Sequence, residues 1–388
     1  MTAPDYPRGP VRLISFLWGL QFSFVNPSLA LLLASVYGAS TAQVSLALAI
    51  SSAAGLLAAW LIPRWCDRRA DYIRPLIGCG IAMIGLCLVL GLSSSLPLAV
   101  LGLVVFGAPA GVGVALLFGF VSHTGGPPSE VVRTRAVFSA SWVAGPPVAS
   151  GIIALAGGHA LVWVLAGVTV VNIAVTTRLL RARVVADVAP SPVRTTPARV
   201  PRTVVALLVV AFALLATINS ATVSITTLFV SDDLGLSPLW GGVALGVAAG
   251  LEVPVLLLIG RHHGRLRDLT LLTFACVLCA GYGATMALAH SGLVVIAAQL
   301  FNAGFVAIIA GAGLTLFQAL IPGPSTAAGA FSNAQRLGGL LAGPLIGLAS
   351  VAGGLRTVFA AGVLVALVSL VVLRLVARLG RREVSTRP

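Results

Sequence analysis

Glu252 is an acidic residue in the middle of a long apolar run, within the sequence GVAAGLEVP at 246–254. If that run crosses a membrane, an ionised side chain within it costs about 3 kcal/mol or more. Such a residue is usually retained for a ligand, a proton or a partner arginine. We therefore expect Glu252 to bind a ligand and to carry a proton, and a purely structural ion pair is the alternative.

Arg135 and Trp142 form a second candidate site. They are seven residues apart, which places them two turns apart on one face of a helix. An indole ring offers a flat apolar surface for the C–H face of a sugar, with an N–H group at its edge. A guanidinium adds a rigid fork of donors for hydroxyl oxygens. The alternative is that Arg135 only extends to lipid headgroups and that Trp142 is an ordinary packing residue.

Carboxamide side chains recur within other apolar runs. They both donate and accept hydrogen bonds, as sugar hydroxyls do. Those that we expect to bind the same ligand are Asn219, Gln299, Asn302, Gln318 and Asn333. For each of them the alternative is a hydrogen bond that joins two membrane helices. Arg336 is a further candidate, because a shift of a few residues in the predicted boundary moves it from the membrane edge into the membrane.

The composition defines the class of protein that must position these residues. Hydrophobic residues make up 58% of the 388-residue chain and charged residues 9%, whereas a soluble domain is typically about one quarter charged. A net charge of +14 would suggest nucleic-acid binding in a soluble protein. Here the arginines occur in small groups between apolar runs, which argues against that function. The five cysteines predict no disulfide framework. We predict an all-α membrane protein.

Twelve apolar runs are long enough to cross the hydrocarbon core as helices, which takes about 20 residues each. They lie at 12–36, 43–63, 74–92, 97–121, 135–156, 160–178, 203–230, 239–260, 269–289, 293–320, 327–352 and 356–376. If the N-terminus is cytoplasmic, every arginine except Arg356 falls on the cytoplasmic side. Because positive residues collect on that side, both termini are predicted to be cytoplasmic.

The chain divides into two halves. The segment 181–202 is rich in proline and arginine and cannot bury enough apolar surface to order itself. It is predicted to be a cytoplasmic linker between six-helix bundles at 1–180 and 203–388. Ala-Gly-Pro recurs at 144–146 and 342–344, in the fifth run of each half. Two halves of this kind resemble the major facilitator architecture, which implies a substrate site between them near the middle of the membrane.

The loop at 64–71, with the sequence RWCDRRAD, resembles the facilitator signature G-x-x-x-D-[RK]-x-G-[RK]-[RK]. Asp67 and Arg68 match it, whereas Ala70 replaces the second glycine. The resemblance implies that Asp67 and Arg68 help to close the cytoplasmic gate. A solvated basic turn that only sets the topology is the alternative.

Two further stretches resemble particular facilitator helices. The spacing from Arg133 through Arg135 to Trp142 resembles the sugar-binding helix of the lactose permease. The sequence GAPA at 107–110 is similar to the fourth helix of that permease, although the acid that follows there is missing. Gly-Pro-Pro at 145–147 resembles an element in the fifth helix of facilitator exporters.

Most of the chain, and the second half above all, resembles the bacterial sugar efflux transporters of the Set family. The stretches that carry this resemblance are GVAAGLEVP at 246–254, MALAHS at 286–291, QLFNA at 299–303, FQALIPG at 317–323 and NAQRLG at 333–338. The resemblance implies a multi-pass protein of the bacterial inner membrane that exports sugars or sugar-like molecules.

We therefore predict a secondary active transporter, not an enzyme, that exports a sugar-like solute by alternating access in exchange for protons. Its expected partners are the solute, protons and membrane lipid, with no nucleic acid. We expect a monomer that uses no cofactor and no metal. A multidrug/proton antiporter of the same fold is one alternative, and a membrane sensor that transports nothing is the other.

Overall fold

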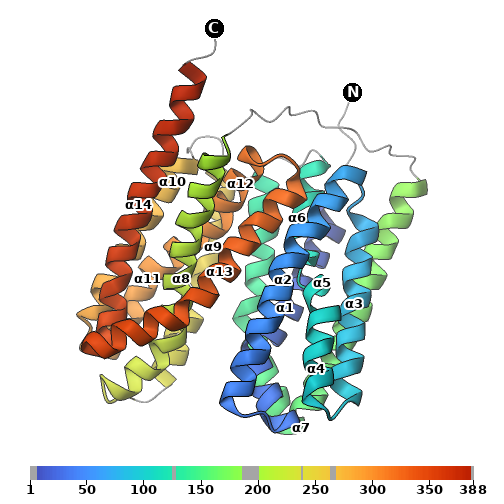
Figure 1. Ribbon diagram of the computed structural model, residues 1–388, viewed down its shortest axis with the longest axis horizontal. Coiled ribbons are helices and arrows are strands. Elements are labelled where there is room, and N and C mark those ends of the chain that lie inside the picture. The colour runs from blue at the N-terminus through green and yellow to red at the C-terminus, as the bar shows by residue number, and fades with distance from the viewer. Residues whose placement is uncertain (1–6, 125–127, 186–200, 237–238, 263–267, 386–388) are drawn as a thin grey trace. The chain divides into compact units, whose positions relative to one another are not determined.

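The computed structural model describes residues 7–124, 128–185, 201–236, 239–262 and 268–385, and every regular element in these ranges is a helix (Figure 1). The chain forms two compact units. The first comprises Met1–Thr195 together with Gly323–Gly329, and the second comprises Thr196–Pro322 together with Ala330–Pro388.

The boundary at Thr195 falls within the predicted linker 181–202, of which residues 186–200 lie outside the described ranges. Helix continues to Val185 on one side of it and begins again at Arg202 on the other. The division of the chain into two six-helix bundles and a linker stays a prediction.

The first unit contains eight helical elements. They are α1 (Arg8–Tyr37), α2 (Thr41–Arg69), α3 (Ile73–Leu92), α4 (Leu96–Gly102), η1 (Leu103–Gly107), α5 (Ala108–Ala110), α6 (Gly113–His123) and α7 (Pro128–Val185). Within α7 the backbone is not helical at Gly157, with φ 82° and ψ 170°. Only glycine adopts this conformation readily, so α7 consists of two helices that meet at a glycine.

The second unit contains the remaining elements. They are α8 (Arg202–Asp232), α9 (Leu239–His262), α10 (Asp268–Ala287), α11 (Gly292–Ile308), η2 (Ile309–Gly313), α12 (Leu314–Leu320), α13 (Pro324–Gly353) and α14 (Leu355–Ser385). The first turn of α13 belongs to the first unit, because Gly323–Gly329 packs there.

Eleven helical segments in the described ranges are long and apolar enough to cross a membrane. They match eleven of the twelve predicted runs, and the remaining run, 12–36, lies in α1, a helix of 30 residues. Large apolar side chains on these segments are exposed, among them Leu57, Ile81 and Leu364, and lipid rather than water would cover them. The predicted all-helical membrane class is confirmed, while the count of twelve and the orientation stay predictions.

Each unit has its own apolar core. In the first unit it includes Phe24, Leu86 and Leu161, which come from α1, α3 and α7. In the second unit Phe359 packs edge-on against Phe229 with 5.0 Å between ring centroids. Such aromatic pairs add about 0.5–1.5 kcal/mol beyond the burial of their surface.

A short π-helix interrupts one long span in each unit. In the first unit η1 separates α4 from α5, and in the second unit η2 separates α11 from α12. Both π-helices lie in the fourth predicted run of their own half. Such segments are rare and occur frequently at functional sites.

Candidate functional site

The predicted gate residue Asp67 lies in the last turn of α2. Its carboxylate accepts hydrogen bonds from the backbone N–H groups of Ser325 at 3.1 Å and Thr326 at 2.7 Å. Both donors are in the segment Gly323–Gly329 of the same unit. They are N–H groups of the first turn of α13, which have no partner within that helix, and the helix N-terminus favours a negative charge. Asp67 therefore caps the start of α13.

Two backbone conformations allow this cap to form. Gly323 has a φ of +87°, and a Cβ atom at this position would overlap the Asp67 carboxylate. Ala70 ends α2 in the left-handed conformation with φ 51°, which glycine adopts without strain. Ala70 therefore occupies a glycine-type position, at the point where the facilitator signature has its second glycine.

Tyr72 extends the network around Asp67. Its buried hydroxyl donates a hydrogen bond to the Asp67 carboxylate. Burial first, and then the negative charge and the hydrogen bond of Asp67, raise the pKa of Tyr72 well above its ordinary value. The Tyr72 ring also packs on His123, with 4.9 Å between ring centroids. Arg68, the second predicted gate residue, is exposed.

Arg135 and Trp142 both lie on the first half of α7. The Arg135 guanidinium lies over the ring of Phe138, 4.6 Å from its centroid. Trp142 is half-buried, and its indole N–H is enclosed without a hydrogen-bond partner among the described residues. An enclosed donor without an acceptor is costly, so this N–H group is available to a bound molecule.

The helix α1 packs along this part of α7. A Cβ atom at Gly19 would meet the Ser141 side chain, and one at Gly145 would meet the side chain of Ser23. These two close approaches fix the register of the helices. Residue 21 lies between 19 and 23, just as residue 142 lies between 141 and 145, so Gln21 and Trp142 are at the same level along the pair.

Gln21 is a candidate that sequence reasoning missed. It is fully buried, and within the described ranges neither the oxygen nor the nitrogen of its carboxamide has a hydrogen-bond partner. The indole N–H of Trp18, one turn away, is likewise enclosed without a partner there. A glutamine inside an apolar run was the available signal, the same one that singled out Gln299 and Gln318.

In the second unit two of the predicted ligands bond to each other. Asn302 donates to the Gln299 side-chain oxygen at 3.0 Å, and Gln299 donates to the carbonyl of Val295 at 3.0 Å. Both side chains are buried, beside the hydroxyl of Tyr282. This arrangement is what a structural role predicts, although the Asn302 oxygen has no partner in the described part of the chain.

The other predicted ligands of the second unit are half-buried. Asn219 lies on α8, Glu252 on α9, Gln318 on α12, and Asn333 and Arg336 one turn apart on α13. The side-chain oxygen of Asn219 is enclosed without a partner in the described ranges. Arg135 and Trp142 belong to the first unit and Glu252 to the second. A common pocket for these three residues stays a prediction.

Glu130 is a buried acid that sequence reasoning passed over. It lies in the first turn of α7, and its Oε1 accepts from Arg12 of α1, with 3.0 Å to Nη2 and 3.3 Å to Nε. Arg133 is 3.9 Å away on the same helix. The predicted run began at 135, whereas α7 begins at Pro128. Proline at the start of a helix was the missed signal.

Among the described residues, no group of three or more His, Cys, Asp and Glu side chains could hold a metal ion. The five cysteines are all buried as free thiols.

Two helical units with enclosed polar groups inside apolar spans are typical of polytopic membrane transporters. The chain belongs to the Major Facilitator Superfamily, whose family model matches residues 12–343. It is thus a multi-pass membrane protein and not an enzyme, and its bacterial relatives indicate the inner membrane.

Within that family the chain is similar to sugar efflux transporters. It is 29% identical over 351 residues, covering 89% of each chain, to Sugar efflux transporter A of Dickeya chrysanthemi. It is 27% identical over 376 residues, covering 94% of each chain, to Sugar efflux transporter A of Escherichia coli. The predicted resemblance to the sugar efflux transporters is confirmed, while the likeness of single helices to the lactose permease stays a prediction.

Solved structures of other facilitators share the fold. A bacterial homologue of the iron transporter ferroportin, in its outward-facing state, has a TM-score of 0.76 at 15% identity, covering 96% of this chain and 99% of its own. The fucose:proton symporter of Escherichia coli has a TM-score of 0.69 at 16% identity, covering 95% and 98%. At these identities the likeness shows the fold alone.

Proposed function

We propose that the protein exports sugars or sugar-like small solutes by alternating access, in exchange for protons. Relatives that bear the name sugar efflux transporter match almost the whole chain and support this class of solute. The observation that carries the proposal is the presence of enclosed polar atoms on Gln21 and Trp142, at one level of the α1–α7 pair, that have no hydrogen-bond partner among the described residues.

The chemistry of these atoms suits a polyol. A buried donor or acceptor without a partner costs about 1–3 kcal/mol, and a sugar hydroxyl can satisfy either kind because it both donates and accepts. The Trp142 ring supplies an apolar surface for the C–H face of the sugar. In this proposal Arg135 releases Phe138 to reach a hydroxyl, and Gln21 joins the ligands predicted from the sequence.

The remaining predicted ligands belong to the second unit, and one of them couples transport to protons. Asn219, with its enclosed and unpaired oxygen, accepts from the solute together with Gln318, Asn333 and Arg336. Glu252 alternates between solute and proton, because it is an acid within a membrane span. Gln299 and Asn302 contribute once their mutual hydrogen bond opens.

Asp67 serves as the inner gate in this proposal. It holds the segment Gly323–Gly329 through two hydrogen bonds from backbone N–H groups. Opening the cytoplasmic side breaks these bonds and closing re-forms them. Arg68 stabilises the closed turn by its charge.

Uptake of labelled lactose or glucose into inverted membrane vesicles tests the proposal. Wild-type protein should accumulate the sugar when a proton gradient is imposed, and Glu252→Gln should abolish the dependence on that gradient. Asp232→Asn is the matched control, since it removes an exposed acid from the same unit. Accumulation of lipophilic cations without any effect of sugar would favour the multidrug exporter, and no flux of either kind would favour the sensor.

A further inference from the structure

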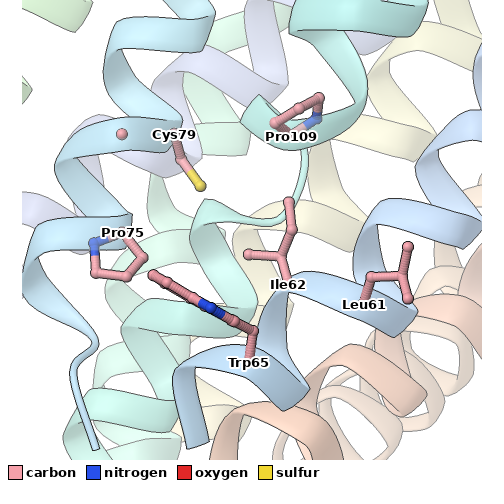
Figure 2. A pocket seen from close by; sticks show the side chains of 7 residues that line it. Leu61, Ile62, Trp65, Pro75, Cys79 and Pro109 are labelled. Carbon is pink, nitrogen blue, oxygen red and sulfur yellow. The ribbon is translucent and has the colours of Figure 1, made fainter. Parts of the chain in front are cut away.

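An apolar groove of about 330 Å³ lies on the first unit where α2, α3 and α5 meet (Figure 2). Leu61, Ile62 and Trp65 of α2, Pro75 and Cys79 of α3, and Pro109 of α5 form its walls. None of the residues predicted to bind the sugar lines it. Its volume is within the range of sites that hold small ligands.

The groove opens toward the surface of the unit. Leu61 is 54% exposed and Trp65 is 47% exposed, and a Cβ atom at Gly78 would meet nothing within 4 Å. Figure 2 shows the Trp65 indole extending from α2 toward Pro75, with the Cys79 thiol directed into the space beside it. The segments Leu46–Arg69 and Ile73–Leu92 are candidate membrane spans, which gives lipid access to the groove, and its apolar walls favour an apolar occupant.

Cationic side chains stand at one end of this groove. The Arg69 guanidinium lies over the Trp65 ring, 4.6 Å from its centroid, and Arg68 and Arg74 are exposed nearby in sequence. In the predicted orientation this end faces the cytoplasmic leaflet. A tryptophan with an arginine beside it is typical of the interface between hydrocarbon and headgroups.

The acids of the same turn do not neutralise these arginines fully. The Asp67 carboxylate is engaged by the N–H groups of Ser325 and Thr326, and Asp71 pairs with Arg74 at 3.7 Å. The four arginines at 64–74 outnumber the two acids there, and Arg69 places part of this surplus positive charge beside the groove. Basic groups at this depth attract anionic lipid headgroups by about 1 kcal/mol each.

We propose that the groove binds one acyl chain of an anionic glycerophospholipid whose phosphate group contacts Arg69. The acyl chain covers Trp65 and fills the space over Gly78, and the guanidinium that lies over the indole donates to the phosphate oxygens. Arg68 adds charge without a direct contact. The bound lipid thus packs against α2 two residues before the gate residue Asp67.

Other occupants fit these observations less well. A zwitterionic lipid would fill the apolar groove but would not use the surplus charge. Free phosphate would use the charge but leave the groove empty. An anionic phospholipid satisfies both features, which lie next to each other because Arg69 packs on a residue that lines the groove.

Retention of lipid by the purified protein tests the proposal. Native mass spectrometry from micelles with equal phosphatidylglycerol and phosphatidylcholine should show preferential retention of phosphatidylglycerol. Gly78→Leu should reduce that retention about five-fold or more because the new side chain occupies the groove. Gly167→Leu is the matched control, since Gly167 is also an exposed glycine of a helix in the same unit with nothing within 4 Å of a Cβ atom. Equal effects of the two substitutions, or equal retention of the two lipids, would overturn the proposal.

The headgroup contact has its own test in the same experiment. Arg69→Gln should lower the ratio of phosphatidylglycerol to phosphatidylcholine about five-fold, the equivalent of one basic residue. Arg378→Gln, which removes an exposed arginine from α14, should not change it. Excess inorganic phosphate should leave the lipid bound, and its displacement by phosphate would show an anion site in place of a lipid site.

Tryptophan fluorescence of the protein reconstituted into vesicles provides a second readout. The Trp65 emission is the difference between the emission of the wild type and that of Trp65→Phe. Phosphatidylglycerol brominated in its acyl chains should quench this Trp65 emission more strongly than brominated phosphatidylcholine does. The emission that Trp163→Phe removes comes from an exposed residue of α7 and should be quenched equally by both lipids. Equal quenching of the Trp65 emission by both lipids would contradict the proposal.

Discussion

The carboxylate of Asp67 accepts a 2.7 Å hydrogen bond from the backbone N–H group of Thr326, a residue 259 positions further along the chain. A charged acceptor makes such a bond shorter and stronger than a neutral one. The pair explains why an acid is found among four arginines of the α2–α3 turn, a place where the topology alone would favour only positive charge.

The capping role of Asp67 predicts a graded response to substitution. Replacing a capping acid by alanine costs about 0.5–2 kcal/mol, whereas asparagine keeps one acceptor oxygen in place of the two that the N–H groups of Ser325 and Thr326 use. Asp67→Ala should therefore lower the midpoint of thermal unfolding in detergent more than Asp67→Asn does. Asp71→Asn, which removes an ion pair with a largely exposed arginine, should have little effect. Equal losses from Asp67→Ala and Asp67→Asn would contradict this account, because the one acceptor oxygen that asparagine keeps would then add no stability.

Tyr72 predicts a dependence of stability on alkaline pH. Its pKa is raised in the folded protein, chiefly by burial. The contribution of such a tyrosine to folding stability is fully present below about pH 10, which is the pKa of tyrosine in the unfolded chain. It is lost as the pH rises above that value, because the unfolded chain then releases the proton while the folded protein keeps it. Tyr72→Phe should therefore lose less stability than wild type between about pH 9.5 and 11. An unchanged slope in thermal unfolding across that interval would contradict this account.

The long apolar runs were enough to predict most of the helices, because hydrocarbon requires continuous helical spans and their length is fixed by its thickness. The same reasoning could not predict η1 or η2. The residues of these π-helices are as apolar as those around them, so hydropathy does not distinguish a π-helical turn from an α-helical one.

The candidate site was predictable where polar residues stand out from their surroundings. Trp142 and Asp67 were singled out in this way, the latter through its resemblance to a family signature, and their roles stay predictions. Gln21 gave the same signal as Gln299 and Gln318, a glutamine in an apolar run, but the sequence does not show which of these amides is paired and which is left without a partner. Glu130 was missed because its burial depends on Arg12 of another helix, a contact that no local pattern specifies.

The ion pair of Arg12 and Glu130 predicts unequal effects of removing its two members. The Arg12 side chain is 39% exposed and that of Glu130 only 3%. Arg12→Gln leaves a buried carboxylate with only Arg133 near it, and should lower the free energy of unfolding by about 2–3 kcal/mol. Glu130→Gln leaves an arginine that water can reach, and should cost about 1 kcal/mol.

The double variant separates this account from a simple loss of packing. Once Glu130 is neutral, removal of Arg12 should cost little more, so the effects of the two substitutions should not add. Thermal unfolding of the two single variants and the double variant in one detergent measures this. Additive losses would contradict a direct interaction between the two side chains.

Trp142 provides a prediction about the transport step itself. Trp142→Phe keeps an aromatic surface and deletes only the enclosed N–H group. If that group donates to the solute, the loss of one neutral hydrogen bond of about 0.5–1.5 kcal/mol should raise the KM for sugar roughly three- to ten-fold. Trp163→Phe makes the same change at an exposed residue of α7 and should leave KM unchanged.

Trp142→Ala should raise the KM for sugar more than Trp142→Phe does, because the stacking surface is removed as well. A KM that stays constant in Trp142→Phe, measured in vesicles with equal amounts of protein, would remove the indole N–H from the site and leave Gln21 as the candidate in the α1–α7 pair.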